Sequence, residues 1–210
     1  MTMLSRVLGL VRDVVIANLL GASLAADVFL FAQKIPNFLR RLFAEGAFAQ
    51  AFVPVLKDIQ QNDTRAILHQ FINRVAGTLA IILMIVAILG VVGSKGLVST
   101  FGFGFIDQPD KFALANDLLK ITFPYIFFIS LAGFCGALLN SVQRFAVPAF
   151  APVLLNVSII CSALFFAPGM DEPGRALAWA ILIAGILQLA IHIPFLWREK
   201  LLPKPQWGWG

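Results

Sequence analysis

The residues of this chain with the most chemical potential are eight ionised side chains inside its first two apolar segments. They are Arg6, Arg12, Asp13, Asp27, Lys34, Arg40, Arg41 and Glu45. If these segments cross a membrane, each charge near the bilayer centre costs about 2.5–3.5 kcal/mol. Such residues persist where they face water, a partner charge or a bound ligand. We therefore expect the functional site to lie in these two segments.

In the first segment, helical geometry sorts the polar residues into two pairs. Arg6 and Asp13 are seven residues apart, which is about 700° of helix and places them within about 20° of one face. Ser5 and Arg12 form a second pair with the same spacing on another face. The spacing predicts two polar faces on one helix.

In the second segment, Asp27, Lys34 and Arg41 repeat every seven residues, and Glu45 follows Arg41 by four. This spacing predicts one charged stripe along a helix. Arg40 lies about 100° away from that stripe.

Charge balance indicates what the stripe and its neighbours bind. Five of the eight residues are basic and three are acidic, so at least two positive charges lack a partner in these segments. We interpret Arg6, Arg12 and Arg40 as the binding site for an external anion, since the planar guanidinium holds phosphate oxygens bidentately. An ion-pair network that only joins the helices remains the alternative.

Composition indicates an integral membrane protein. The chain is 60% hydrophobic and 13% charged, with a mean hydropathy of +0.88. Four runs contain no Asp, Glu, Lys or Arg: residues 75–93, 121–142, 145–168 and 176–196. Each is near the roughly 20 residues that a helix needs to cross the hydrocarbon core. Buried core helices of a soluble protein would leave too little polar surface.

The fold class that follows is an all-α, six-helix transmembrane bundle in one domain over residues 1–198. We expect helices at about residues 3–20, 25–56, 64–93, 111–142, 145–168 and 175–197, with a loop over 94–110. Pro36 and Gly46 are expected to bend the long second helix, and Asp63 or Thr64 to cap the third. Residues 199–210 are expected to form a cytoplasmic linker tail.

The basic residues of the connections predict the orientation. With the N-terminus inside, the inner connections carry six basic residues: Lys57, Arg65, Arg144, Arg198, Lys200 and Lys204. The outer connections carry three: Lys95, Lys111 and Arg175. Positive charge favours the cytoplasmic side, so we expect both termini to be cytoplasmic. No basic face then remains for nucleic acid.

The sequence shows no pattern for a metal or a cofactor. Cys135 and Cys161 lie in apolar runs and predict neither a disulfide framework nor a metal site. His69 and His192 are interpreted as packing or interfacial histidines. We expect no cofactor and no metal.

Several strings resemble the MurJ (MviN) family of lipid II flippases over nearly the whole chain. The strings are residues 5–9 (SRVLG) with Arg12-Asp13, 34–41 (KIPNFLRR), 43–48 (FAEGAF), 119–125 (LKITFPY) and the stretch from Asn140 to Asn156. The resemblance implies a bacterial inner-membrane transporter of the multidrug/oligosaccharidyl-lipid/polysaccharide exporter superfamily. Such proteins move lipid II, the lipid-linked peptidoglycan precursor, from the inner to the outer leaflet for cell-wall biosynthesis.

The resemblance also implies a site and a partner. The arginines that the family needs for function match Arg6, Arg12 and Arg40, in a central cationic cavity. Supporting cavity or gate positions are Ser5, Asp13, Asp27, Lys34, Asn37, Arg41 and Glu45. Family members have two six-helix lobes and a terminal helix pair, so this chain resembles the N-terminal lobe, with the lobe from helix seven onward as its partner. Lipid II or a related polyprenyl-diphosphate lipid, together with membrane lipids, is the expected ligand.

Two other classes remain open. One is another polyprenyl-diphosphate oligosaccharide exporter or a drug exporter of the same superfamily, although a cationic drug should favour an acidic cavity. The other is a membrane enzyme acting on polyprenyl diphosphates, which would need a nucleophile or base beside the arginines. Neither histidine lies in the charged segments, which disfavours the enzyme.

Overall fold

A computed structural model describes residues 2–21, 24–42 and 47–206, with the backbone alone at residues 2, 24, 25, 36, 40 and 47. This described part is helical and contains no strand. Its elements are α1 (Thr2–Leu20), α2 (Leu24–Arg40), α3 (Ala47–Asn62), α4 (Arg65–Val92), α5 (Ser94–Phe101), η2 (Phe103–Phe105), α6 (Pro109–Thr122), α7 (Tyr125–Ser141), α8 (Ala146–Cys161), η3 (Ser162–Phe166), η4 (Ala167–Gly169) and α9 (Pro173–Arg198).

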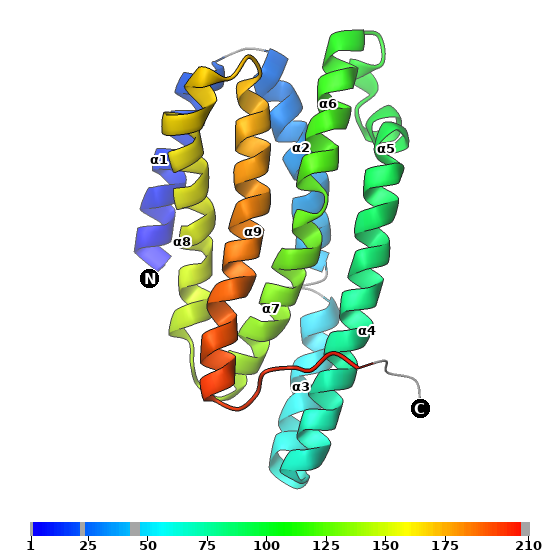
Figure 1. Cartoon of the computed structure of the whole chain (residues 1–210), viewed down its shortest axis with the longest axis vertical. Helices are drawn as coiled ribbons and strands as arrows, with labels where there is room; N and C mark the ends of the chain where they lie inside the picture. The colour runs from blue at the N-terminus through cyan, green and yellow to red at the C-terminus, as the bar shows by residue number, and fades with distance from the viewer. Residues whose placement is uncertain (1, 22–23, 43–46, 207–210) are drawn as a thin grey trace.

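The helices run along one long axis, with α9 at the centre of the bundle (Figure 1). α9 packs against α7 and α8 and also contacts α6, while α1 lies along α8 and α2 lies along α6. The α7–α8 turn lies at the same end of the bundle as the C-terminal ends of α3 and α9 (bottom in Figure 1), and we name it the α7–α8 end. The α8–α9 loop and α5 lie toward the opposite end.

Four helical stretches are long and apolar enough to cross a membrane: Arg65–Val92, Pro109–Ser141, Ala146–Gly169 and Pro173–Arg198. They contain the four charge-free runs of the sequence, so the multi-pass membrane assignment is confirmed. Among the described residues, α1 and α2 do not meet these criteria of length and composition. The expected number of six spanning helices therefore remains a prediction.

The structure describes the predicted helix over residues 25–56 as two helices, on either side of the undescribed residues 43–46. α2 ends at Arg40, and α3 begins at Ala47 and extends to Asn62. Both helices contact α7, but α2 packs mainly on α6 whereas α3 also packs on α4. In α3, Phe52 stacks on Phe71 of α4 at 5.7 Å between ring centroids. Gly46, expected to be a soft point, lies in residues 43–46, outside the described part.

Two other expected boundaries need correction. The predicted helix over 111–142 consists of α6 and α7, interrupted at Phe123 and Pro124, because proline supplies no backbone N–H. The expected loop over 94–110 contains the helix α5 and the short η2. By contrast, the first, third and sixth helices agree with the prediction, and Thr64 Oγ1 accepts a bond from the Ile67 amide at 3.4 Å as an N-cap.

The tail after α9 lies across α4 (Figure 1). The Lys204 amide donates to Asn73 Oδ1 at 2.8 Å, and the Gln206 amide donates to the Asn73 carbonyl at 3.2 Å. An added Cβ at Gly77 would overlap the Gln206 backbone. The predicted linker tail is thus held on α4 over its described residues.

Close packing of α4 on α6 gives a stability prediction. A Cβ at Gly90 would overlap the ring of Phe123, which is buried at 3% exposure. We expect Gly90→Ala to destabilise the fold by about 1–3 kcal/mol, measured as a lower thermal unfolding midpoint in detergent. Gly96→Ala is the matched control, since nothing lies within 4 Å of its added Cβ. Equal midpoints for the two variants would contradict the packing.

Candidate functional site, a cationic cavity

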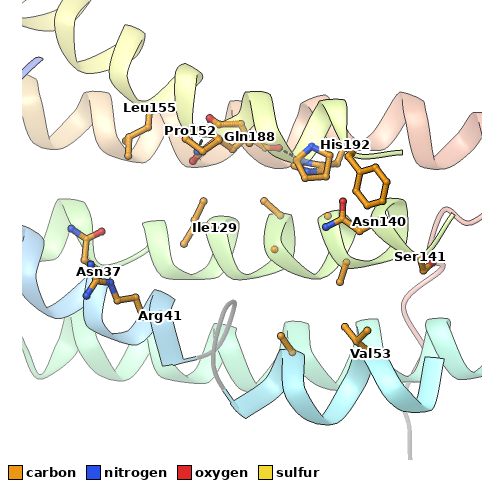
Figure 2. Close-up of a pocket in the computed structure, with 18 of the residues that line it drawn as sticks. Asn37, Arg41, Val53, Ile129, Asn140, Ser141, Pro152, Leu155, Gln188 and His192 are labelled. Carbon is orange, nitrogen blue, oxygen red and sulfur yellow. Dashed lines mark hydrogen bonds between the residues drawn. The ribbon is translucent and has the colours of Figure 1, made fainter. Parts of the chain in front are cut away.

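A cavity of about 940 Å³ extends from the α7–α8 turn into the bundle, with α7 on one side and α8 and α9 on the other (Figure 2). Residues of α1, α2 and α3 complete its lining. The polar lining residues are Arg12, Asn37, Arg41, Lys57, Tyr125, Asn140, Ser141, Gln143, Gln188 and His192.

The charge of the cavity is of one sign. Arg12, Arg41 and Lys57 are among its described lining residues, and no Asp or Glu is. None of the described carboxylates lies within ion-pair distance of Arg41 or Lys57. A concave site with surplus cations attracts anions, so the cavity suits an anionic ligand.

Arg12 is held in position by two neighbours. Its Nε and Nη2 donate to Asp13 Oδ1 at 2.9 and 2.7 Å, and its Nη1 donates to Asn156 Oδ1 at 3.0 Å. Asn156, on α8, in turn donates to the Ser5 carbonyl at 3.2 Å. A guanidinium has five N–H groups, so one N–H on each terminal nitrogen has no acceptor among the described residues. These two N–H groups are left to donate to an anionic ligand such as a phosphate.

The end of α2 brings a second cation to the cavity. Asn37 and Arg41 are four residues apart and both line it. Asn37 also lines an adjoining cavity of about 40 Å³ with Arg12 and Tyr125. Arg12, Asn37 and Arg41 therefore line one cavity, although they come from two parts of the chain.

Other predicted site residues do not reach the cavity. Arg6 and Lys34 are exposed and are not among the lining residues of this cavity. The expectation that Arg6 shares a cavity with Arg12 stays a prediction. Asp27 Oδ2 lies 3.8 Å from Lys111 Nζ. Asp27 and Arg41 are about 21 Å apart along a helix. The residues of the predicted stripe therefore do not all reach the same cavity. Ser5 contributes only its backbone carbonyl, to Asn156.

Two predicted site residues cannot be placed. The side chain of Arg40 and the whole of Glu45 lie outside the described residues.

The sequence interpretation missed most of the uncharged polar residues of the cavity and one of its cations. Lys57, taken as part of a cytoplasmic connection, lines the cavity, as do Gln188 and His192 from a charge-free run. Asn156, from another such run, is 5% exposed and orients Arg12. The available signal was an amide or imidazole inside an apolar span, because such a group needs a polar partner there.

The helical fold, its apolar spans and the cationic cavity define a multi-pass membrane protein with a site for an anionic ligand. A family model described as lipid II flippase MurJ matches residues 16–210. The chain therefore belongs to the MurJ family of lipid II flippases, which are transporters rather than enzymes.

Similar proteins cover the whole chain. A probable lipid II flippase MurJ of Haemophilus influenzae is 55% identical over 100% of this chain and 42% of its own length. The corresponding protein of Vibrio cholerae is 48% identical over 100% and 41%, and the lipid II flippase MurJ of Burkholderia cenocepacia is 41% identical over 96% and 39%. The chain thus spans about two fifths of the length of these relatives.

A solved structure gives the same fold. A lipid II flippase MurJ in an inward closed conformation superposes with a TM-score of 0.80 at 30% identity, over 98% of this chain and 42% of that one. The one-lobe, all-α membrane architecture expected from the sequence is confirmed.

Proposed function

We propose that this lobe binds the diphosphate of lipid II, or of a related polyprenyl-diphosphate lipid, in the cationic cavity. The lobe would then help to move that lipid from the inner to the outer leaflet for cell-wall biosynthesis. The observation that supports this proposal most directly is the charge of the cavity: its described lining contains Arg12, Arg41 and Lys57 but no acidic residue. The names of the similar proteins support the same ligand.

Each predicted site residue has a proposed role. The unpaired N–H groups of Arg12 hold phosphate oxygens, with Arg41 and Lys57 as further cations and Asn37 beside them. Asp13 orients Arg12. The remaining roles depend on a second lobe. Toward that lobe the cationic surface is extended by Arg6, Lys34 and Arg40. The cavity or its gate is supported by Ser5, Asp27 and Glu45.

Transport by alternating access needs a second rigid body. We propose a second helical lobe as the partner, packed against α1 and α2. Exposed apolar residues on α1, among them Met3, Val7 and Leu10, lie on the same helix as the exposed Arg6. This mixture of apolar and charged exposure suits an interface that encloses an aqueous cavity.

We propose the bacterial inner membrane as the location, with both termini cytoplasmic. The α7–α8 turn carries Arg144, and α9 ends at Arg198 at the same end of the bundle. The opposite end has Asp171 and Glu172 before α9. Positive charge favours the cytoplasmic side, so the cavity, which reaches Gln143 of the α7–α8 turn, would open inward.

Binding of a prenyl diphosphate to the chain in lipid nanodiscs tests the proposal. We expect saturable binding that weakens as salt rises, because the attraction is between charges, and no binding of the corresponding prenyl alcohol. The measurement is the retained labelled lipid, with free phosphate assayed in the same samples. Equal retention of the alcohol and the diphosphate would refute the anion site. Release of phosphate would favour the enzyme, and competition by a cationic drug would favour the drug exporter.

A further inference from the structure

α9 presents two buried polar side chains to the cavity. Gln188 is 2% exposed and His192 is 1% exposed, and both line the cavity. Gln188 Oε1 and His192 Nε2 have no hydrogen-bond partner among the described residues. Buried polar atoms are almost always paired, so two unpaired atoms at one cavity wall call for a ligand.

The other bonds of these side chains determine what the free atoms can do. Gln188 Nε2 donates to the Ala151 carbonyl at 2.8 Å, which leaves Oε1 as an acceptor. His192 Nδ1 lies 2.5 Å from the Gln188 carbonyl. Since a carbonyl can only accept, Nδ1 carries the proton, and Nε2 of the neutral imidazole is an acceptor. Both free atoms are therefore acceptors that need a donor.

A glycine on the facing helix lies close to the free nitrogen of His192. A Cβ at Gly136 of α7 would lie 3.6 Å from His192 Nε2, within the cavity lining. Figure 2 shows Gln188 and His192 on the α9 wall near Asn140, while Asn37 and Arg41 lie farther along the cavity. The two acceptors and Arg41 thus lie at different places along one cavity.

We propose that Gln188 and His192 form an acceptor subsite for hydroxyl or amide N–H groups of a headgroup whose phosphates are held by the cations. This inference rests on the proposed function and deepens it, because it assigns the recognition of the headgroup beyond the diphosphate. Hydroxyls of a sugar and amides of a peptide are both such donors. A site with unpaired buried acceptors discriminates strongly against ligands without donors.

Binding to nanodisc-embedded chain is measured for three ligands: a prenyl diphosphate, a prenyl diphosphate-linked disaccharide, and lipid II with its peptide. We expect the disaccharide or the peptide to tighten binding by about tenfold, the effect of roughly one hydrogen bond in a site. A gain at the disaccharide step assigns sugar hydroxyls, and a gain only at the peptide step assigns amides.

Variants of the cavity wall test whether the tighter binding of the larger ligands depends on Gln188 and His192. Gln188→Leu and His192→Leu should lose it while binding of the prenyl diphosphate stays at the wild-type value. Gly136→Ala should also lose it, and it leaves every bond of Gln188 and His192 in place if either leucine variant fails to fold. His69→Leu is the matched control, since His69 Nε2 is also unpaired and buried but does not line the cavity.

Equal affinity for the three ligands, or a gain that survives in all cavity variants, would overturn the subsite and leave the proposed function standing. Loss of prenyl diphosphate binding in the wild type would instead count against the proposed function. In that case, binding of the free disaccharide tests the subsite separately. Binding that is lost in the Gln188 and His192 variants supports the subsite, and the absence of binding overturns it.

Discussion

We expect Arg12→Ala, in an assembled two-lobe transporter, to abolish transfer of lipid II between leaflets and to leave membrane insertion unchanged. Arg12 is the cavity cation with an unpaired N–H on each terminal nitrogen. A hydrogen bond to a charged group contributes about 1.5–3 kcal/mol, so loss of two such bonds weakens diphosphate binding by more than about a hundredfold. Insertion is not harmed, because a costly charge is removed from the span.

Three variants separate the fork of Arg12 from its charge. Arg12→Lys keeps the charge without the planar fork and should be partly defective. Asn156→Leu removes the acceptor that positions Nη1 and should have a smaller effect than Arg12→Ala. Arg65→Ala is the control, since Arg65 is an exposed arginine at the start of α4 that does not line the cavity.

The measurement is the appearance of labelled lipid II in the outer leaflet of proteoliposomes, with protein insertion assayed in the same vesicles. Transfer at the wild-type rate by Arg12→Ala would refute the proposed role. Equal losses in Arg12→Ala and Arg65→Ala would show that the effect is not specific to the cavity.

The 210-residue lobe reconstituted alone should not move lipid II across a bilayer. Alternating access requires two bodies that rock against each other, so that the site opens to one side at a time. Alone, the lobe leaves the exposed charges of Arg6 and Lys34 without a common cavity. Exposure of such charges to lipid costs several kcal/mol after snorkelling, about 2.5–3.5 kcal/mol per residue at the bilayer centre. The lobe should therefore aggregate or associate with another lobe.

A membrane potential does not rescue the isolated lobe. An inside-negative potential drives an anion outward by about 2.3 kcal/mol per charge for each 100 mV, but this force needs a gated path. The experiment compares liposomes that contain the lobe, a full-length relative such as the Haemophilus influenzae protein, or no protein, each with labelled lipid II. Leaflet exchange by the lobe above the rate of empty liposomes would show that the prediction is wrong.

The sequence alone determined the class of protein and most of its helices. Hydropathy and charge are local properties, so the four charge-free runs predicted the four spanning stretches that the structure contains. Local signals also located two helix ends: Gly21, with φ of 59° after α1, and Thr64, which caps α4. The cost of charge in apolar segments directed attention to Arg12, which does line the cavity.

Only the tertiary structure decided which polar residues meet. Arg12 and Asn156 are 144 residues apart in the chain, and the packing of α1 on α8 joins them. The packing of α3 on α4 and α7 likewise brings Lys57 to the cavity. In the sequence, Gln188 and His192 are two polar residues of an apolar span with no sign of a shared role. Only the packing of α7 opposite α9 shows that both line the cavity. The physical reason is that the free-energy cost of a charged side chain in an apolar segment, and its position on the helix face, depend on the local sequence. The partners of that side chain depend on which helices pack against it.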